Sequence, residues 1–125
     1  MSYIYLASPY SDPERHIRFL RYTLACKTVA TLYMKGVTVF SPIVHCHYIA
    51  GQYNLPTDAD FWWKHNKEML DKAYALYILD IDEWQHSEGV RQEIKEAHTM
   101  DIQCHMVKPG GDVYEYVKPE LWELD

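Results

Sequence analysis

The chain of 125 residues has no excess of basic residues, no paired cysteine spacing and no long apolar run. Its formal net charge of −6 argues against a protein that binds a nucleic acid polymer, because phosphate contacts need a basic surface. The three cysteines are odd in number and form no CxxC, as is typical of reduced thiols in a cytoplasmic protein. No window approaches the ~20 apolar residues of a membrane span, so we expect no membrane association and no signal peptide.

Glycine-rich phosphate motifs are missing as well. The sequence contains neither GxGxxG nor GxxxxGK, and no GxSxG nucleophile elbow. An ordinary nucleotidase or esterase therefore lacks its signature here. The negative net charge still permits a small anionic ligand, since one arginine and a few backbone N–H groups can hold a phosphate.

Apolar runs alternate with helical spacings along a length that suits one domain, 1–125. We expect strands over 3–7, 37–40, 74–80 and 102–107, helices over about 12–35, 58–72 and 87–100, a long loop over 41–58, and a fifth strand or a helical turn in the tail. This order predicts an α/β fold, a Rossmann-like or flavodoxin-like three-layer sandwich with a mostly parallel sheet of four to five strands. The loops SPYSDPER, SPIVHCH and DIDEWQHSEG then gather at one edge, where ligands bind such sheets.

Glu93 is the acid that a surface role explains least. Its helical neighbours at three and four residues are Gly89, Val90, Glu96 and Ala97, and none is a cation. Helical side chains lean toward the N-terminus, so Glu93 leans over Gly89 and leaves a gap that a ligand can fill. The ordinary alternative is an unpaired glutamate on a solvated face.

Two loops add polar groups to the same edge. Ser87 is a candidate N-cap, and the free N–H groups at Ser87 and Gly89 favour an anion such as a phosphate. In the first loop, Ser8, Tyr10 and Arg15 each have a routine turn or capping role. Taken together, the two loops predict a sugar-phosphate pocket.

Other polar residues are weaker candidates. His45 and His47 alternate on a segment that looks strand-like, but their spacing matches no standard zinc pattern, so we expect no metal and no cofactor, with His45 lining the pocket. Asn66 lies on the inward stripe of the second long helix, where a buried amide needs a partner. Asp80, at the end of a strand, is a candidate contact for a ligand hydroxyl.

The stretch IYLASPYS, followed after a later strand by S-x-G-x-x-x-E, resembles the nucleoside 2-deoxyribosyltransferase superfamily and the related 2′-deoxynucleoside 5′-monophosphate N-glycosidases. With ASPY, FSPIVH and W-x-x-S-x-G-V-x-x-E-I, the whole chain most resembles a small bacterial family of uncharacterised proteins within that group. The resemblance implies a small-molecule nucleoside or nucleotide as ligand. It also implies a homo-oligomer in which a neighbouring subunit often completes the site.

The resemblance makes Glu93 the nucleophile that attacks the anomeric carbon and displaces the base. It places Ser87 and Gly89 at the 5′ group, and Ser8 and Tyr10 along the sugar and base. One departure concerns Asn66, which stands where the transferases commonly have an aspartate that assists the leaving base.

Tyr74, in turn, replaces another aspartate of the family. Two alternatives therefore stay open: a non-catalytic nucleotide-binding module of the same fold, and a metal-dependent hydrolase that uses His45 and His47.

Overall fold

The computed structural model describes residues 2–56 and 58–122. Five strands form one sheet: β1 (Ile4–Ala7), β2 (Val39–Phe40), β3 (Ala75–Leu79), β4 (Cys104–Val107) and β5 (Val113–Glu115). They lie in the order β2-β1-β3-β4-β5, and only β5 runs antiparallel to its neighbour. The order reverses between β1 and β3, so the crevice at their carboxyl ends is where this topology binds ligands.

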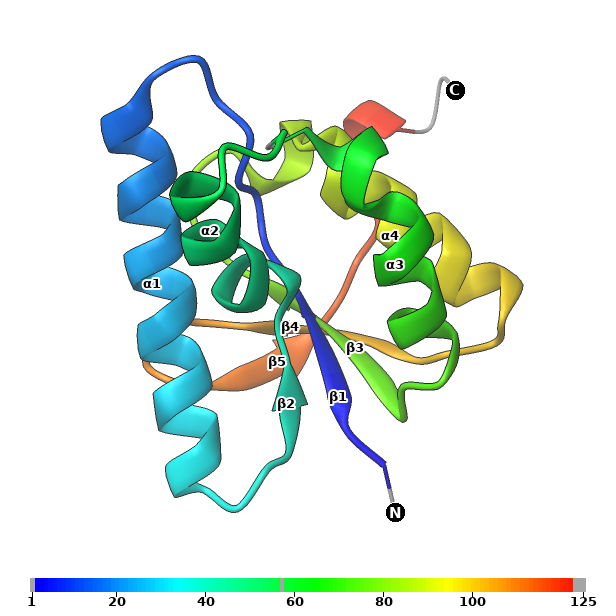
Figure 1. The fold of residues 1–125 in the computed structure, drawn as a ribbon. Helices are drawn as coiled ribbons and strands as arrows, with labels where there is room; N and C mark the ends of the chain where they lie inside the picture. Colours follow the sequence, from blue (N-terminus) through cyan, green and yellow to red (C-terminus); the bar gives the residue numbers. More distant parts are fainter. Residues whose placement is uncertain (1, 57, 123–125) are drawn as a thin grey trace.

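Four α-helices cover the two faces of the sheet: α1 (Arg15–Met34), α2 (Pro42–Gln52), α3 (Ala59–Asp71) and α4 (Glu88–Thr99). There are also two short 3₁₀ helices in the described residues. The first, η1 (Trp84–His86), precedes α4, and the second, η2 (Glu120–Trp122), follows β5. Figure 1 shows α1 and α2 together on one side of the sheet, and α3 and α4 on the other. The three-layer, mostly parallel α/β sandwich predicted from the sequence is confirmed.

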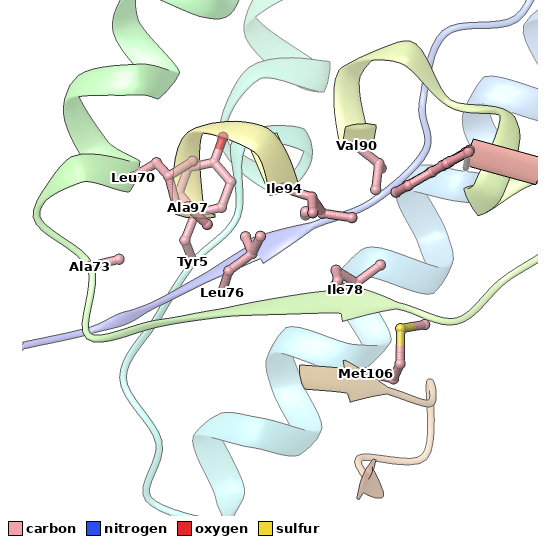
Figure 2. Close-up of a cluster of buried hydrophobic side chains, with 11 residues drawn as sticks. Tyr5, Leu70, Ala73, Leu76, Ile78, Val90, Ile94, Ala97 and Met106 are labelled. Carbon is pink, nitrogen blue, oxygen red and sulfur yellow. The ribbon is translucent and has the colours of Figure 1, made fainter. Parts of the chain in front are cut away.

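Each face of the sheet has its own apolar core. Alternate residues of β1 divide between them, because Ile4 and Leu6 pack with α1 whereas Tyr5 and Ala7 pack with α3 and α4. Figure 2 shows the second core, in which side chains from α3 and α4 meet those of β1, β3 and β4. A strand covered on both faces is apolar throughout, which explains the uninterrupted run that opens the chain.

Two local predictions were wrong. The first long helix begins at Arg15 rather than at a cap formed by Ser11 or Asp12, because the Asp12 carboxylate accepts the N–H of Glu14 at 2.8 Å and closes a turn first. The expected loop over 41–58 contains α2, which starts with Ser41 as N-cap and Pro42 in its first turn. Within the described residues, no helix is long and apolar enough to cross a membrane.

Candidate active site

A cavity of about 400 Å³ lies where the chain leaves β1, β2 and β3. Its walls come from the loop after β1, the start of α2, the start and middle of α3, and η1 with the first turns of α4. The lining residues are Ser8, Tyr10, Ser11, Pro42, Ile43, Cys46, Asp58, Asp60, Trp62, Trp63, Asn66, His86, Ser87, Glu88, Gly89, Gln92 and Glu93. This volume falls in the range of small-molecule sites.

Glu93 lines this cavity from α4 and is only 7 % exposed. The hydroxyl group of Tyr5 donates a hydrogen bond to Glu93 Oε2. Within the part of the chain that the structure describes, Oε1 has no hydrogen bond to another residue, and no lysine or arginine forms an ion pair with the carboxylate. Glu93 therefore does not lie on a solvated face, which was the ordinary alternative.

Burial controls the charge of this carboxyl group. Loss of solvent raises the pKa of Glu93 from 4.5 to about 8, and the hydrogen bond from Tyr5 acts in the opposite direction. A hydrogen bond that stabilises the ionised form helps a buried carboxyl group to lose its proton. The carboxylate that results can act as a base or a nucleophile near neutral pH. A carboxyl group poised in this way, in a cavity wall, is typical of a functional site.

Tyr5 connects the core to the cavity. Its side chain is fully buried beside Leu76 and Ile94, and Figure 2 shows it between β1 and the helices α3 and α4. Burial and the nearby Glu93 raise the pKa of the Tyr5 phenol well above 10, so the phenol stays a proton donor toward Glu93. The sequence pattern did not reveal this role, because a tyrosine inside an apolar strand has the pattern of a core residue.

Ser8 supplies an unused hydroxyl group. It follows β1 directly, is 6 % exposed and lines the cavity. Its Oγ is buried and has no hydrogen-bond partner among the described residues. A buried hydroxyl group without a partner is costly, and a ligand hydroxyl in the cavity would satisfy it.

Ser87 and Gly89 bring the start of α4 to the same cavity. Ser87 is the N-cap, as predicted, and its Oγ accepts the N–H of Val90 at 3.2 Å. Ordinary capping therefore occupies the Ser87 side chain, and Glu88 in the first turn already places a negative charge at this helix end.

Tyr10 and Asn66 also line the cavity. The Tyr10 hydroxyl lies 2.6 Å from His47 Nδ1, and the His47 ring stacks on Tyr22 at 4.1 Å. The Asn66 side-chain oxygen lies 3.2 Å from His65 Nδ1. Cys46, on α2, lines the cavity as well, and burial raises the pKa of its thiol to about 11.

Three predicted residues are not among those that line the cavity. Arg15 is exposed at the start of α1. His45 is exposed on α2, with its ring stacked on His65 at 5.8 Å. The carboxylate of Asp80 accepts a hydrogen bond from the Tyr114 hydroxyl of β5, and Asp80 lines a second hollow beside η1.

The two histidines of the metal alternative do not share a side of their segment. That segment is helical rather than strand-like, so residues two apart point in different directions. His45 faces His65, whereas His47 faces Tyr22. No group of three or more His, Cys, Asp or Glu that could hold a metal ion occurs in residues 2–56 and 58–122.

The carboxylates and indoles at the start of α3 were missed as cavity residues. Asp58 is the N-cap of α3 and accepts the N–H of Phe61 at 3.3 Å, while Asp60 is exposed in the first turn. Trp62 donates its indole N–H to the Pro56 carbonyl at 2.8 Å, and Trp63 packs partly against the core. These residues line the same cavity as Ser8, which the predicted loop over 41–58 and helix over 58–72 did not indicate.

The comparison with curated proteins gives no match. A family model, Domain of unknown function (DUF1937), matches residues 2–108, from the residue before Tyr3 through the end of β4. That description names no activity and no ligand. The match spans Ser8, Glu93 and every other residue that lines the cavity. The chain therefore belongs to the DUF1937 family.

Proposed function

We propose that this protein cleaves the N-glycosidic bond of a nucleoside or nucleoside 5′-monophosphate, as a hydrolase or a transferase of the nucleoside 2-deoxyribosyltransferase type. The observation that carries the proposal is the buried Glu93 carboxyl group, held by the Tyr5 phenol in the wall of a cavity of about 400 Å³. The motifs IYLASPYS and S-x-G-x-x-x-E, whose Ser8, Ser87 and Glu93 all line that cavity, support it.

In the proposed reaction, an oxygen of ionised Glu93 attacks C1′ of the sugar. The C1′–N bond breaks, its electron pair leaves with the base, and a glycosyl ester forms on Glu93. Water or a second base then attacks C1′, and the ester oxygen leaves as the carboxylate. Tyr5 holds Oε2 throughout, and the Ser8 hydroxyl is available for a hydrogen bond to the sugar.

A panel of ribo- and deoxyribonucleosides with their 5′-monophosphates tests this function. The purified protein is incubated with each compound, and free base is measured by chromatography. Glu93→Gln is expected to lower base release by at least about 10³-fold, as for other catalytic nucleophiles. Glu68→Gln, which removes an equal charge from an exposed position on α3, serves as the control.

A covalent intermediate gives an independent readout. Intact-protein mass spectrometry under rapid quench should detect an adduct of sugar mass on the native chain and none on Glu93→Gln. Full activity in Glu93→Gln would remove Glu93 from the reaction.

The second candidate is a binding module without turnover. The Asn66 amide, which has no proton to give to a leaving base, and the pKa of Glu93 at about 8 favour it. Nucleosides that raise the melting temperature of the native chain, with no free base after long incubation, would establish this alternative.

A further inference from the structure

Among the described side chains that line the cavity, the formally charged groups are carboxylates, and the guanidinium groups of Arg18 and Arg21 bind backbone carbonyls of residues 10–13 in the adjoining loop. Asp58, Asp60 and Glu88 line the cavity together with Glu93, whereas no lysine or arginine does so in the part of the chain that the structure describes. All three additional carboxylates lie on exposed residues. A ligand that enters the cavity therefore meets a surface suited to a cation.

Two indole side chains line the same cavity. Trp62 and Trp63 are half-buried, and Trp62 has already committed its N–H group to the Pro56 carbonyl. What Trp62 can still offer a ligand is its π surface, which attracts cations more strongly than any other side-chain ring. The aromatic and the acidic side chains of the cavity thus both favour a positively charged ligand.

Three groups in or beside the cavity wall, Tyr5, Cys46 and Asn66, are poor proton donors toward a leaving base, which leaves the Tyr10 hydroxyl, shared with His47 at 2.6 Å, and His86 as other described donors of the wall. Tyr5 donates its proton to Glu93, the Cys46 thiol has a pKa of about 11, and the amide of Asn66 has no proton to release. A neutral nucleoside base leaves as an anion unless it receives a proton. A base that already carries a positive charge leaves as a neutral molecule and needs none.

From these features we infer that the substrate is a nucleoside whose base is cationic, such as an N-ribosylpyridinium or an N-alkylated purine nucleoside. This inference rests on the proposed function and narrows its substrate. When the Glu93 carboxylate attacks C1′, the C1′–N bond breaks, and its electron pair neutralises the positive nitrogen. The Ser8 hydroxyl, buried and without a partner among the described residues, gives the sugar a hydrogen bond that does not depend on charge.

A cation in the cavity also acts on the nucleophile. A positive charge near a carboxyl group favours its ionised form, so the substrate itself would lower the pKa of Glu93 from about 8. A neutral nucleoside has no such effect.

Binding to the Glu93→Gln protein tests the inference without interference from turnover or from the greater chemical lability of cationic nucleosides. The probes are two matched pairs: N-ribosylnicotinamide with its uncharged dihydro form, and 7-methylguanosine at mildly acidic pH with guanosine. By calorimetry, we expect the cationic member to bind at least about tenfold more tightly in each pair. The double variant Asp58→Asn/Asp60→Asn, which keeps a capping side chain at the start of α3, should bring the ratio toward one.

Glu68→Gln, the matched charge change outside the cavity, should leave that ratio as it is. Equal or tighter binding of the uncharged members, or a ratio that Asp58→Asn/Asp60→Asn does not change, would overturn the inference. Turnover of the same four compounds by the native chain separates the two proposals. Glu93-dependent release from guanosine without any preference for the cationic members, or release of base only from other compounds of the nucleoside and 5′-monophosphate panel, contradicts only the inference. Release of base from none of the four and from no compound of that panel contradicts the inference and the proposed function together.

Discussion

The hydrogen bond between Tyr5 and Glu93 links a core residue to the charge of the candidate nucleophile. The phenol donates to Oε2, and this contact partly offsets the rise in pKa that burial imposes on the carboxyl group. Without the phenol, desolvation acts alone. Tyr5 is therefore a positioning residue whose effect should appear in the pH dependence of the reaction.

Tyr5→Phe is expected to raise the pKa of Glu93 and to move the alkaline rise in kcat/KM to higher pH. Each unit of that shift lowers the ionised fraction near neutrality about tenfold, so activity at pH 7 falls accordingly. A pH profile of base release measures the shift. Tyr3→Phe is the matched control, since the Tyr3 hydroxyl donates to the Met69 carbonyl at 2.6 Å and not to Glu93. Identical profiles for Tyr5→Phe and the native chain would contradict this role.

Sequence patterns predicted much of the site and missed residues whose signal was ambiguous. Ser8, Ser87 and Glu93 follow or precede elements whose order puts them at one edge, and the structure brings them to one cavity. The sequence pattern does not distinguish Tyr5 from an ordinary core tyrosine. Its ring packs in the apolar core, whereas its hydroxyl group donates to Glu93, and only the ring contributes to the apolar pattern of the strand. Asp80 does follow β3 at this edge, but its carboxylate is hydrogen-bonded to Tyr114 of β5 and it lines the second hollow, a pairing with the tail that the sequence pattern did not indicate.

At the scale of elements, α2 is the helix that the sequence pattern failed to predict. The segment SPIVHCHYIAGQ has weak amphipathic periodicity, and its histidines alternate as in a strand. The start signal was nevertheless present, because Ser41 precedes Pro42 and accepts the N–H of Val44 at 3.2 Å. The elements β1, β3, β4, α3 and α4 and the body of α1 were predicted to within a few residues, since sustained apolar patterns outweigh local ambiguity.

The turn between β4 and β5 packs against α1 at Gly111. Its φ is +94°, and a Cβ atom there would lie 2.6 Å from Thr31 Cγ2 and 3.0 Å from Lys35 Nζ. Lys35 also donates to the Gly111 carbonyl at 3.0 Å. This turn therefore connects the antiparallel edge of the sheet, β5, to the C-terminal end of α1.

Gly111→Ala is expected to lower the free energy of unfolding by about 2–4 kcal/mol, from backbone strain plus overlap with Thr31. Gly36→Ala gives the strain alone, because its φ is +83° but no heavy atom lies within 4 Å of the added Cβ, and about 1 kcal/mol is expected. Urea unfolding of the two variants measures the difference. Equal losses in the free energy of unfolding would mean that the Thr31 side chain moves aside at no energetic cost.

The helix η2 packs onto η1 and α4 through Trp122. Trp122 is 5 % exposed, donates its indole N–H to the Gln85 carbonyl at 3.0 Å, and lies under the Arg91 guanidinium at 5.2 Å from the ring centroid. It belongs to the core cluster, although it lies outside the residues 2–108 that the family model matches. The matched segment thus omits part of the core.

Trp122→Ala should lower the free energy of unfolding by about 3–5 kcal/mol through loss of buried contacts. Trp122→Phe should cost less, because it keeps an apolar ring and loses only the hydrogen bond and part of the area. Thermal and urea unfolding report both values. Val117→Ala, at a residue that is 70 % exposed, should change stability by less than about 0.5 kcal/mol. A Trp122→Ala value as small as that control would place the tail outside the cooperative fold.

For the whole molecule, the raised pKa of Glu93 makes folding dependent on pH. Between its usual value of 4.5 and about 8, the folded chain holds a proton on Glu93 that the unfolded chain has lost. The contribution of this group to stability is therefore complete below pH 4.5 and declines as the pH rises toward 8.

The free energy of unfolding of the native chain should fall by up to about 1.4 kcal/mol per pH unit across that interval, relative to Glu93→Gln, which cannot titrate. Urea unfolding of both proteins at several pH values from about 5 to about 8 measures the difference, in which the other titrating groups cancel. Parallel curves would show that Glu93 keeps the same affinity for its proton in the folded and the unfolded chain.

Tyr5 packs in the core between the sheet and the helices, and its hydroxyl group also binds the carboxyl group of Glu93. A change in the packing of its ring therefore also changes the pKa of Glu93. Substitutions that repack the core around Leu76 and Ile94 to raise thermal stability would move the Tyr5 phenol. They would thereby also shift the pH optimum of the proposed reaction. A library selected only for thermal tolerance should therefore yield members with displaced pH optima even when no residue lining the cavity has changed.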